Sequence, residues 1–200
     1  MANQGVDRGR RRFLVAATSV VGGAGVVAVA APFLASWKPS ARAQAAGAPV
    51  EVNVAQIEPG QRISVGWRGR PVWVVRRTPE MLELLPEIRD RLRDPDSEAV
   101  TQQPPYAQNQ YRSIKPEVLV LIGICTHLGC SPAFRPEIGA AEIGDDWPGG
   151  WLCACHGSRF DMAGRVYRNV PAALNLEVPP YHFVSDDVII VGEHADGGIV

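Results

Sequence analysis

Hydrophobic and polar positions divide the chain into an apolar segment near the N-terminus and a mixed remainder. Residues 13–37 carry no charged side chain, and arginines stand just before them at positions 8, 10, 11 and 12. As a helix rising ~1.5 Å per residue, this segment would extend about 37 Å, enough to cross a hydrocarbon core of ~30 Å with some tilt. The pattern predicts a single transmembrane helix over residues 13–37.

Two other interpretations of residues 13–37 are a buried core helix and a cleavable signal peptide. An apolar surface on every side, so near the N-terminus, argues against a core helix. Ala41-Arg42-Ala43 fits a small-x-small cleavage site, but the apolar run is longer than the ~7 to 15 residues of a typical signal peptide core. We therefore expect a retained anchor.

The residues before the anchor predict its orientation. Gly9-Arg10-Arg11-Arg12-Phe13-Leu14 is similar to a twin-arginine export signal, and the arginines alone also satisfy the positive-inside rule. Both interpretations place residues 1–12 in the cytoplasm and the remainder of the chain beyond the membrane. In a bacterium this is a single-pass protein of the inner membrane with a periplasmic head.

Residues 38–49 have no apolar periodicity and are rich in Ala, Gly and Pro. This composition predicts a flexible tether, which as a coil would have an end-to-end distance of about 20 Å. The head, residues 50–200, follows the tether. The expected organisation is thus a cytoplasmic terminus, an anchor, a tether and a head.

The head shows many short β-branched or aromatic runs separated by turn residues. We expect strands at 50–54, 62–67, 71–76, 117–124, 150–153, 166–167, 175–178 and 188–192. One helix is expected to run from Pro79 to about Leu92, with Thr78 as its N-cap. The fold class is therefore all-β, an antiparallel sandwich or partly open barrel with one short helix.

Composition restricts the function. The 200 residues are 46% hydrophobic and 20% charged with a net charge of -1, which is enough for one sizeable domain plus an accessory segment. A chain without a basic field or a nucleic-acid motif is not expected to bind nucleic acid.

All four cysteines and two of the four histidines fall in two short segments, CTHLGC at 125–130 and CACHGS at 153–158. A haem attachment fails on spacing, since it needs two residues between its cysteines. Two disulfides would leave His127 and His156 without a role. A zinc site using four of the six groups stays physically possible. The remaining alternative is a [2Fe-2S] cluster with two thiolates on one iron and two imidazoles on the other, the Rieske arrangement.

The paired motifs resemble those of the Rieske iron-sulfur subunit of ubiquinol-cytochrome c reductase, the cytochrome bc complex, of the proteobacterial type. The resemblance extends over nearly the whole chain and includes the export signal, the anchor, residues 112–116 and residues 175–181. It implies a Rieske-type head with a small cluster-binding subdomain at about 120–172 and one [2Fe-2S] cluster per chain.

The resemblance also implies roles for individual residues. The cluster ligands would be Cys125, His127, Cys153 and His156, and Cys130 and Cys155 would form a disulfide between the two cluster loops. Oxidation of these two cysteines is also expected of an exported head. The resemblance implies further roles near the cluster. Leu128 would form an apolar tip, His156 would contact the quinol, and Gly157 is its neighbour. Ser158 would donate a hydrogen bond to a bridging sulfide, and Pro171 would belong to a proline loop that covers the cluster. Many members have Tyr two positions after the serine, whereas this chain has Phe160.

The function implied is electron transfer within a quinol-cytochrome c oxidoreductase. Two imidazole ligands make the cluster less negative than four thiolates and raise its potential, so that a quinol can reduce it. The chain would take one electron and a proton from quinol at cytochrome b and pass the electron to a membrane-bound c-type cytochrome. It would thereby contribute to proton translocation, with catalysis shared among the subunits of a dimeric complex. The alternatives are the small Rieske subunit of an arsenite oxidase and a structural zinc module.

Overall fold

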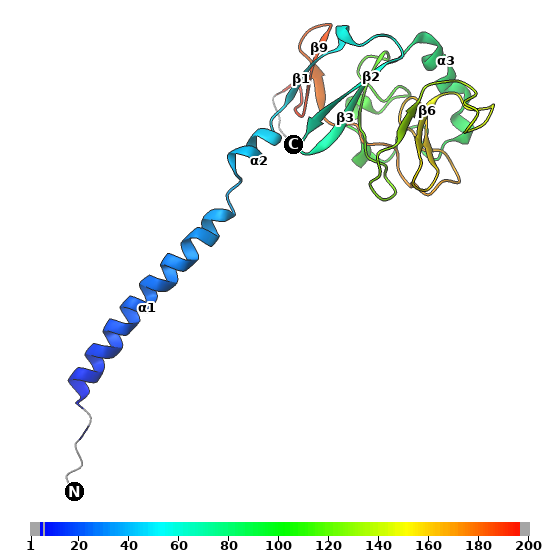
Figure 1. Ribbon diagram of the computed structural model, residues 1–200. Helices are drawn as coiled ribbons and strands as arrows, with labels where there is room; N and C mark the ends of the chain where they lie inside the picture. The colour runs from blue at the N-terminus through cyan, green and yellow to red at the C-terminus, as the bar shows by residue number, and fades with distance from the viewer. Residues whose placement is uncertain (1–4, 6, 197–200) are drawn as a thin grey trace. The chain divides into compact units, whose positions relative to one another are not determined.

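The computed structural model describes residues 5 and 7–196. Residues 1–4 and 6 of the expected cytoplasmic terminus, and residues 197–200 of the head, lie outside the described residues. The chain divides into two compact units, with the boundary between Ala45 and Ala46. Figure 1 labels the elements of both units, which are described separately below.

The N-terminal unit consists of the long helix α1 (Arg8–Ser36) and the short helix α2 (Ala41–Ala46). α1 begins five residues before the predicted span, because the Asp7 carboxylate accepts hydrogen bonds from the N–H groups of Gly9 and Arg10 and so caps the helix earlier. None of its residues is buried, and its length and mean hydropathy of 2.1 suffice to cross a membrane. The helix therefore fits the predicted anchor.

The prediction that residues 38–49 form a coil was wrong in part, since α2 lies within them. Alanine has the highest helix propensity, and Ala41–Ala46 contains four alanines. Ser40 precedes this turn and accepts a hydrogen bond from the N–H of Ala43 at 3.2 Å. Local propensity and a serine cap thus outweigh the absence of apolar periodicity.

The head contains three antiparallel sheets of three strands each, within the residues described (Figure 1). Their orders are β1-β9-β8, β2-β3-β4 and β5-β6-β7. The strands are β1 (Val50–Asn53), β2 (Arg62–Trp67), β3 (Arg70–Arg76), β4 (Val118–Ile122), β5 (Ala133–Arg135), β6 (Gly150–Cys153), β7 (Ser158–Phe160), β8 (Tyr181–Phe183) and β9 (Val188–Val191). The all-β prediction is confirmed.

The sheet β2-β3-β4 forms the core of the head. β4 is buried along its whole length, as its continuous apolar run predicted. The indole of Trp73 on β3 stacks on that of Trp151 on β6, with ring centroids 6.0 Å apart and planes 1° from parallel. This contact fixes the smaller sheet β5-β6-β7 against the larger one. The two loops that carry the paired motifs leave from these two sheets.

Three predicted elements differ from the structure by more than two residues. The helix α3 (Pro79–Glu87) has Thr78 as its N-cap but ends before Leu92, because Pro86 lacks the N–H that would continue the helical ladder. Residues 166–167 form isolated bridges only. Residues 175–178 form no strand, since their backbone groups bond to separate segments: the N–H of Leu176 to Gly164, the carbonyl of Glu177 to Ile122 and the N–H of Val178 to Gln102.

Candidate metal centre

The two motifs form two loops that the sheets place side by side. Loop 1, residues 123–132, joins β4 to β5, and loop 2, residues 154–157, joins β6 to β7. In each motif the first cysteine accepts, through its carbonyl, a backbone hydrogen bond from a glycine four residues later, Cys125 from Gly129 at 3.1 Å and Cys153 from Gly157 at 2.8 Å. Both glycines have positive φ, 85° and 76°, a conformation that side chains disfavour. The spacing Cys-x-x-x-Gly thus produces the same tight turn twice.

A disulfide between Cys130 and Cys155 joins the two loops. It is the pairing that the family resemblance implied. A backbone hydrogen bond of 2.7 Å from the N–H of Cys125 to the carbonyl of Cys130 closes loop 1 beside it. The two loops are therefore covalently held together.

The other two cysteines, Cys125 and Cys153, are free and buried, each 2% exposed. The Cys125 thiol interacts with the Cys153 thiol and with the Ser158 hydroxyl. Burial is the main cause that raises the pKa of Cys125, and the Cys153 thiol raises it further. The Ser158 hydroxyl lowers this pKa. The sulfur of Cys153 also lies within 4.8 Å of both disulfide sulfurs. Because the disulfide cysteines cannot serve as thiolates, the two free thiols are the sulfur ligands that this site can offer.

The two histidines of the motifs meet between the loops. The rings of His127 and His156 have centroids 4.7 Å apart and lie nearly perpendicular, at 89°. The Nδ1 atom of His127 is buried and has no hydrogen-bond partner among the residues that the structure describes. A buried polar atom is rarely left unpaired, and a metal bond would satisfy an imidazole nitrogen. Two free thiols and two imidazoles therefore fit a metal group held between the loops.

The segment that contains Pro171 is hydrogen-bonded to loop 1 and to β7. The buried Ser158 hydroxyl accepts a hydrogen bond of 3.0 Å from the N–H of Ala172, and the Thr126 hydroxyl donates one of 2.6 Å to the carbonyl of Leu174. Pro171 itself is exposed. The role of Thr126 was not predicted, because nothing in the sequence indicates that a hydroxyl between two expected ligands reaches a residue almost fifty positions away.

Exposure distinguishes the two sides of the site. Leu128, in the middle of loop 1, is 71% exposed, and residues 154–157 of loop 2, His156 included, are also exposed. Cys125, Cys153 and Ser158, by contrast, lie in the interior. The site thus has a buried half with the sulfur donors and an exposed half with an imidazole and an apolar tip.

Comparisons with known proteins identify the family. Residues 90–180 match the model of the Rieske [2Fe-2S] domain, and residues 1–40 match that of the ubiquinol-cytochrome c reductase Fe-S subunit TAT signal. A ubiquinol-cytochrome c reductase iron-sulfur subunit from Allochromatium vinosum is 58% identical over 193 residues, 96% of this chain and 93% of that one. The chain belongs to this family of Rieske iron-sulfur subunits. The expected electron-transfer function and [2Fe-2S] cofactor are thereby confirmed, and the zinc-module and arsenite-oxidase alternatives are set aside.

The chain is also similar to a second relative and to a solved structure. The subunit of the same name from Blastochloris viridis is 41% identical, with 92% of each chain covered. Among solved structures, the chain is similar to one of a hyperthermophilic respiratory complex III, at 24% identity and a TM-score of 0.47, covering 88% of this chain and 98% of that one.

Removal of the disulfide is expected to destabilise the head while leaving part of the cluster in place. Its cysteines are 25 positions apart, so the bond constrains the unfolded chain by roughly 3.5 kcal/mol on the entropic model. Cys130→Ala and Cys155→Ala should each lower the free energy of unfolding by that amount and reduce the iron content only partially. Denaturant titration and iron analysis of the full chain test this; unchanged stability in both variants would contradict it.

Phe160→Tyr is expected to raise the potential of the cluster. Phe160 is fully buried on β7, on the same strand face as Ser158, and Ser158 interacts with Cys125. A hydroxyl there would donate to a ligand sulfur, and this bond strengthens when reduction adds negative charge. At ~1 to 3 kcal/mol the shift is about 40 to 130 mV.

The matched change is Ser158→Ala, which should lower the potential by a similar amount because it removes a hydroxyl from Cys125. Protein-film voltammetry of both variants measures the shifts. A Phe160→Tyr potential equal to or below that of the parent would show that the ring at 160 does not face the cluster.

Proposed function

We propose that Cys125 and Cys153 hold one iron of the [2Fe-2S] cluster and that His127 and His156 hold the other. The observation that carries this assignment is the pair of free, buried thiols beside a buried His127 Nδ1 atom without a hydrogen bond. When bound, the cluster supplies a one-electron carrier. The residues around it supply the rest of the chemistry.

The residues of the exposed half of the metal site have separate roles in the proposed function. His156 presents its imidazole at the surface, where it hydrogen-bonds the hydroxyl of a quinol. Leu128 covers the site with apolar surface and docks into the partner that holds the quinol. Gly157 permits the turn that exposes His156, and the Pro171 segment, fixed through Ser158, excludes water from the sulfur side.

The chain would thus take an electron and a proton from quinol at cytochrome b and deliver the electron to a membrane-bound c-type cytochrome. Catalysis is shared with those subunits in a dimeric complex that contributes to proton translocation. Relatives named as iron-sulfur subunits of ubiquinol-cytochrome c reductase, one of them matching 96% of this chain, support this assignment.

The features of α1 support a membrane topology. Its arginines favour the cytoplasmic side for residues 1–12, so the head, residues 50–200, would lie in the periplasm of a bacterial cell. Residues 13–37 would span the inner membrane, and Trp37, 81% exposed, stands where aromatic residues gather at the membrane interface. Residues 38–49 would act as the hinge of the head, and the boundary between the two compact units falls within them.

Leu128→Glu tests the docking role in the assembled complex. The control is Ile138→Glu, since Ile138 is similarly exposed, at 65%, but lies outside both loops. Burial of a leucine side chain at a protein interface stabilises the complex by ~1.5 to 3 kcal/mol. Replacement of Leu128 should therefore slow reduction of the cluster by quinol about tenfold or more. Rapid mixing with quinol measures the rate. Equal rates for the two variants would contradict the proposal.

A further inference from the structure

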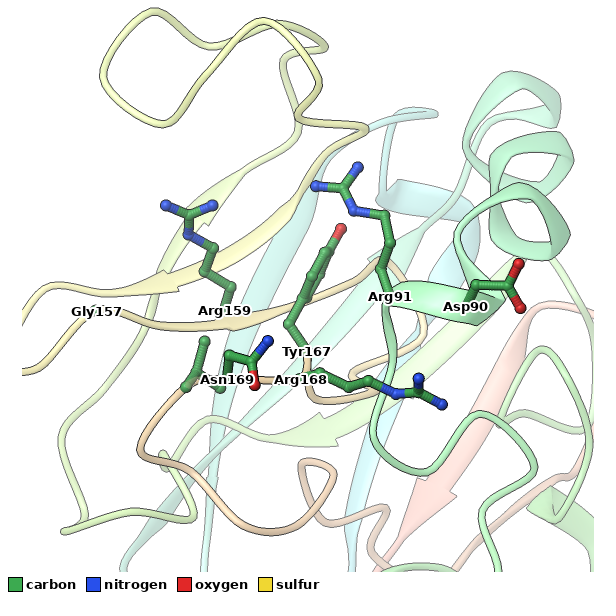
Figure 2. Close-up of a pocket in the computed structure, with 8 residues that line it drawn as sticks. Asp90, Arg91, Gly157, Arg159, Tyr167, Arg168 and Asn169 are labelled. Carbon is green, nitrogen blue, oxygen red and sulfur yellow. The ribbon is translucent and has the colours of Figure 1, made fainter.

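A cavity of about 630 Å³ lies beside loop 2. Gly157, next to the ligand His156, lines one side, and Asn169 and Val170, just before Pro171, line another. Figure 2 shows the cavity with its arginine and tyrosine side chains. The cavity therefore adjoins both the exposed half of the metal site and the segment that covers it.

The lining is strongly cationic. It contains Arg91, Arg159 and Arg168 and one acidic side chain, Asp90. In Figure 2 the side chains of Arg91 and Arg159 extend in a similar direction, and that of Asp90 extends in another. Guanidinium groups bind carboxylates and phosphates with paired hydrogen bonds, so the cavity is suited to an oxyanion.

The three arginines differ in the partners they already have. Arg91 pairs with Asp146 at 2.7 Å, and the Nε atom of Arg168 donates to the carbonyl of Leu92 at 2.8 Å. The Arg159 side chain makes no hydrogen bond or ion pair with any residue that the structure describes. All N–H groups of the Arg159 guanidinium are thus available to donate hydrogen bonds to a ligand.

Tyr167 provides an independent indication of a ligand. Its side chain lines the cavity and is only 5% exposed, and its hydroxyl is buried without a hydrogen-bond partner in the described part of the chain. The guanidinium of Arg91 lies 5.3 Å from the centre of its ring. Burial raises the pKa of Tyr167, so the hydroxyl keeps its proton and can donate. A buried donor of this kind calls for an acceptor.

We propose that this cavity binds an acidic side chain of the partner subunit that docks over His156, with Arg159 and Tyr167 as donors to its carboxylate. The cavity is of the size that holds a side chain with its flanking atoms rather than one small ion. A protein that approaches His156 also covers Gly157, so the contact would guide docking by charge. This inference rests on the proposed function, since it concerns the partner of that same face.

Carbodiimide crosslinking of the assembled complex tests the contact. Arg159→Lys keeps the positive charge and introduces an amine, which forms an amide with a carboxylate as the carbodiimide takes up the water released. The chain has only Lys38 and Lys115 of its own, so few other crosslinks that start from a lysine of this chain are expected. Arg135→Lys is the control, because Arg135 already pairs with Glu142 and lies outside this cavity.

The expected result is a crosslink from position 159 to an Asp or Glu of another subunit, at least tenfold more abundant than any intersubunit crosslink from position 135. A crosslink only to Asp90, or none, in a complex with the parent's reduced-state spectrum would overturn the inference. Quinol-dependent cytochrome reduction by the parent complex tests the proposed function separately, so the two failures are distinguishable.

Discussion

Single replacement of Cys125, His127, Cys153 or His156 by alanine is expected to abolish the cluster. In the proposed assignment each of these side chains is one of four donors to the cluster, so loss of any one leaves an iron one ligand short. Iron and acid-labile sulfide should fall to near zero in each purified variant, and the visible spectrum should be lost. This is the largest effect that the account predicts.

Two comparisons make the ligand prediction specific. His182→Ala changes a histidine that lies 4.0 Å from Glu193 and outside both loops, so it should leave the iron content unchanged. Cys130→Ala removes a cysteine of the same site without removing a ligand and should keep part of the iron. Full iron and sulfide with the parent spectrum in any of the four ligand variants would reject the assignment.

Asp161→Asn is expected to cause the largest loss of stability that does not involve the metal. The Asp161 carboxylate is fully buried; it accepts hydrogen bonds from the N–H groups of Ala163 and Arg165 and pairs with the Arg165 guanidinium at 2.7 Å. Removal of one partner from a buried pair costs ~3 to 5 kcal/mol, because the other charge stays buried alone.

Two further buried cations are stabilised by the negative charge of the Asp161 carboxylate. Arg77 and Arg112 are both buried, and burial lowers their pKa values to about 10, whereas the charge of Asp161 raises both. Their guanidinium groups donate to backbone carbonyls, Arg77 to Met162 and Arg112 to Ala163. Asp161→Asn would thus remove negative charge from the surroundings of three buried guanidinium groups.

Urea unfolding of the full chain, followed by tryptophan fluorescence, measures the loss. The control is Asp96→Asn, which breaks the pair between Asp96 and Arg89 on the surface, where the Asp96 side chain is 60% exposed. That change should cost less than about 1 kcal/mol. Similar unfolding free energies for the two variants would show that the buried pair does not stabilise the head.

The strands of the head could be predicted where several β-branched or aromatic residues follow one another. The runs at 62–67 and 150–153 gave strands with those bounds. The strands β5, β7 and β8 have three residues each, too few for a periodic pattern. Residues 175–178 had the composition of a strand, but their partners are fixed by the packing of distant segments, which the sequence does not display.

The candidate site could be predicted more completely than the fold. Its donor types are rare and fall in two short motifs, so donor type and spacing limited the chemistry to a few metal groups, and the family resemblance then implied the ligand set. The contacts of the residues around the site could not be predicted in the same way. The contact of Thr126 with Leu174, the environment of Asp161 and the arginine cavity each join segments far apart in the chain, and no local pattern indicates them.

The most direct test of the central claim is pulsed electron paramagnetic resonance of the reduced full chain, labelled with ¹⁵N-histidine. If two imidazoles bind one iron, the spectrum should contain hyperfine couplings from two histidine nitrogens, and its average g value should lie below that of an all-cysteine cluster. A reduced signal without histidine nitrogen couplings would contradict mixed ligation by Cys125, Cys153, His127 and His156.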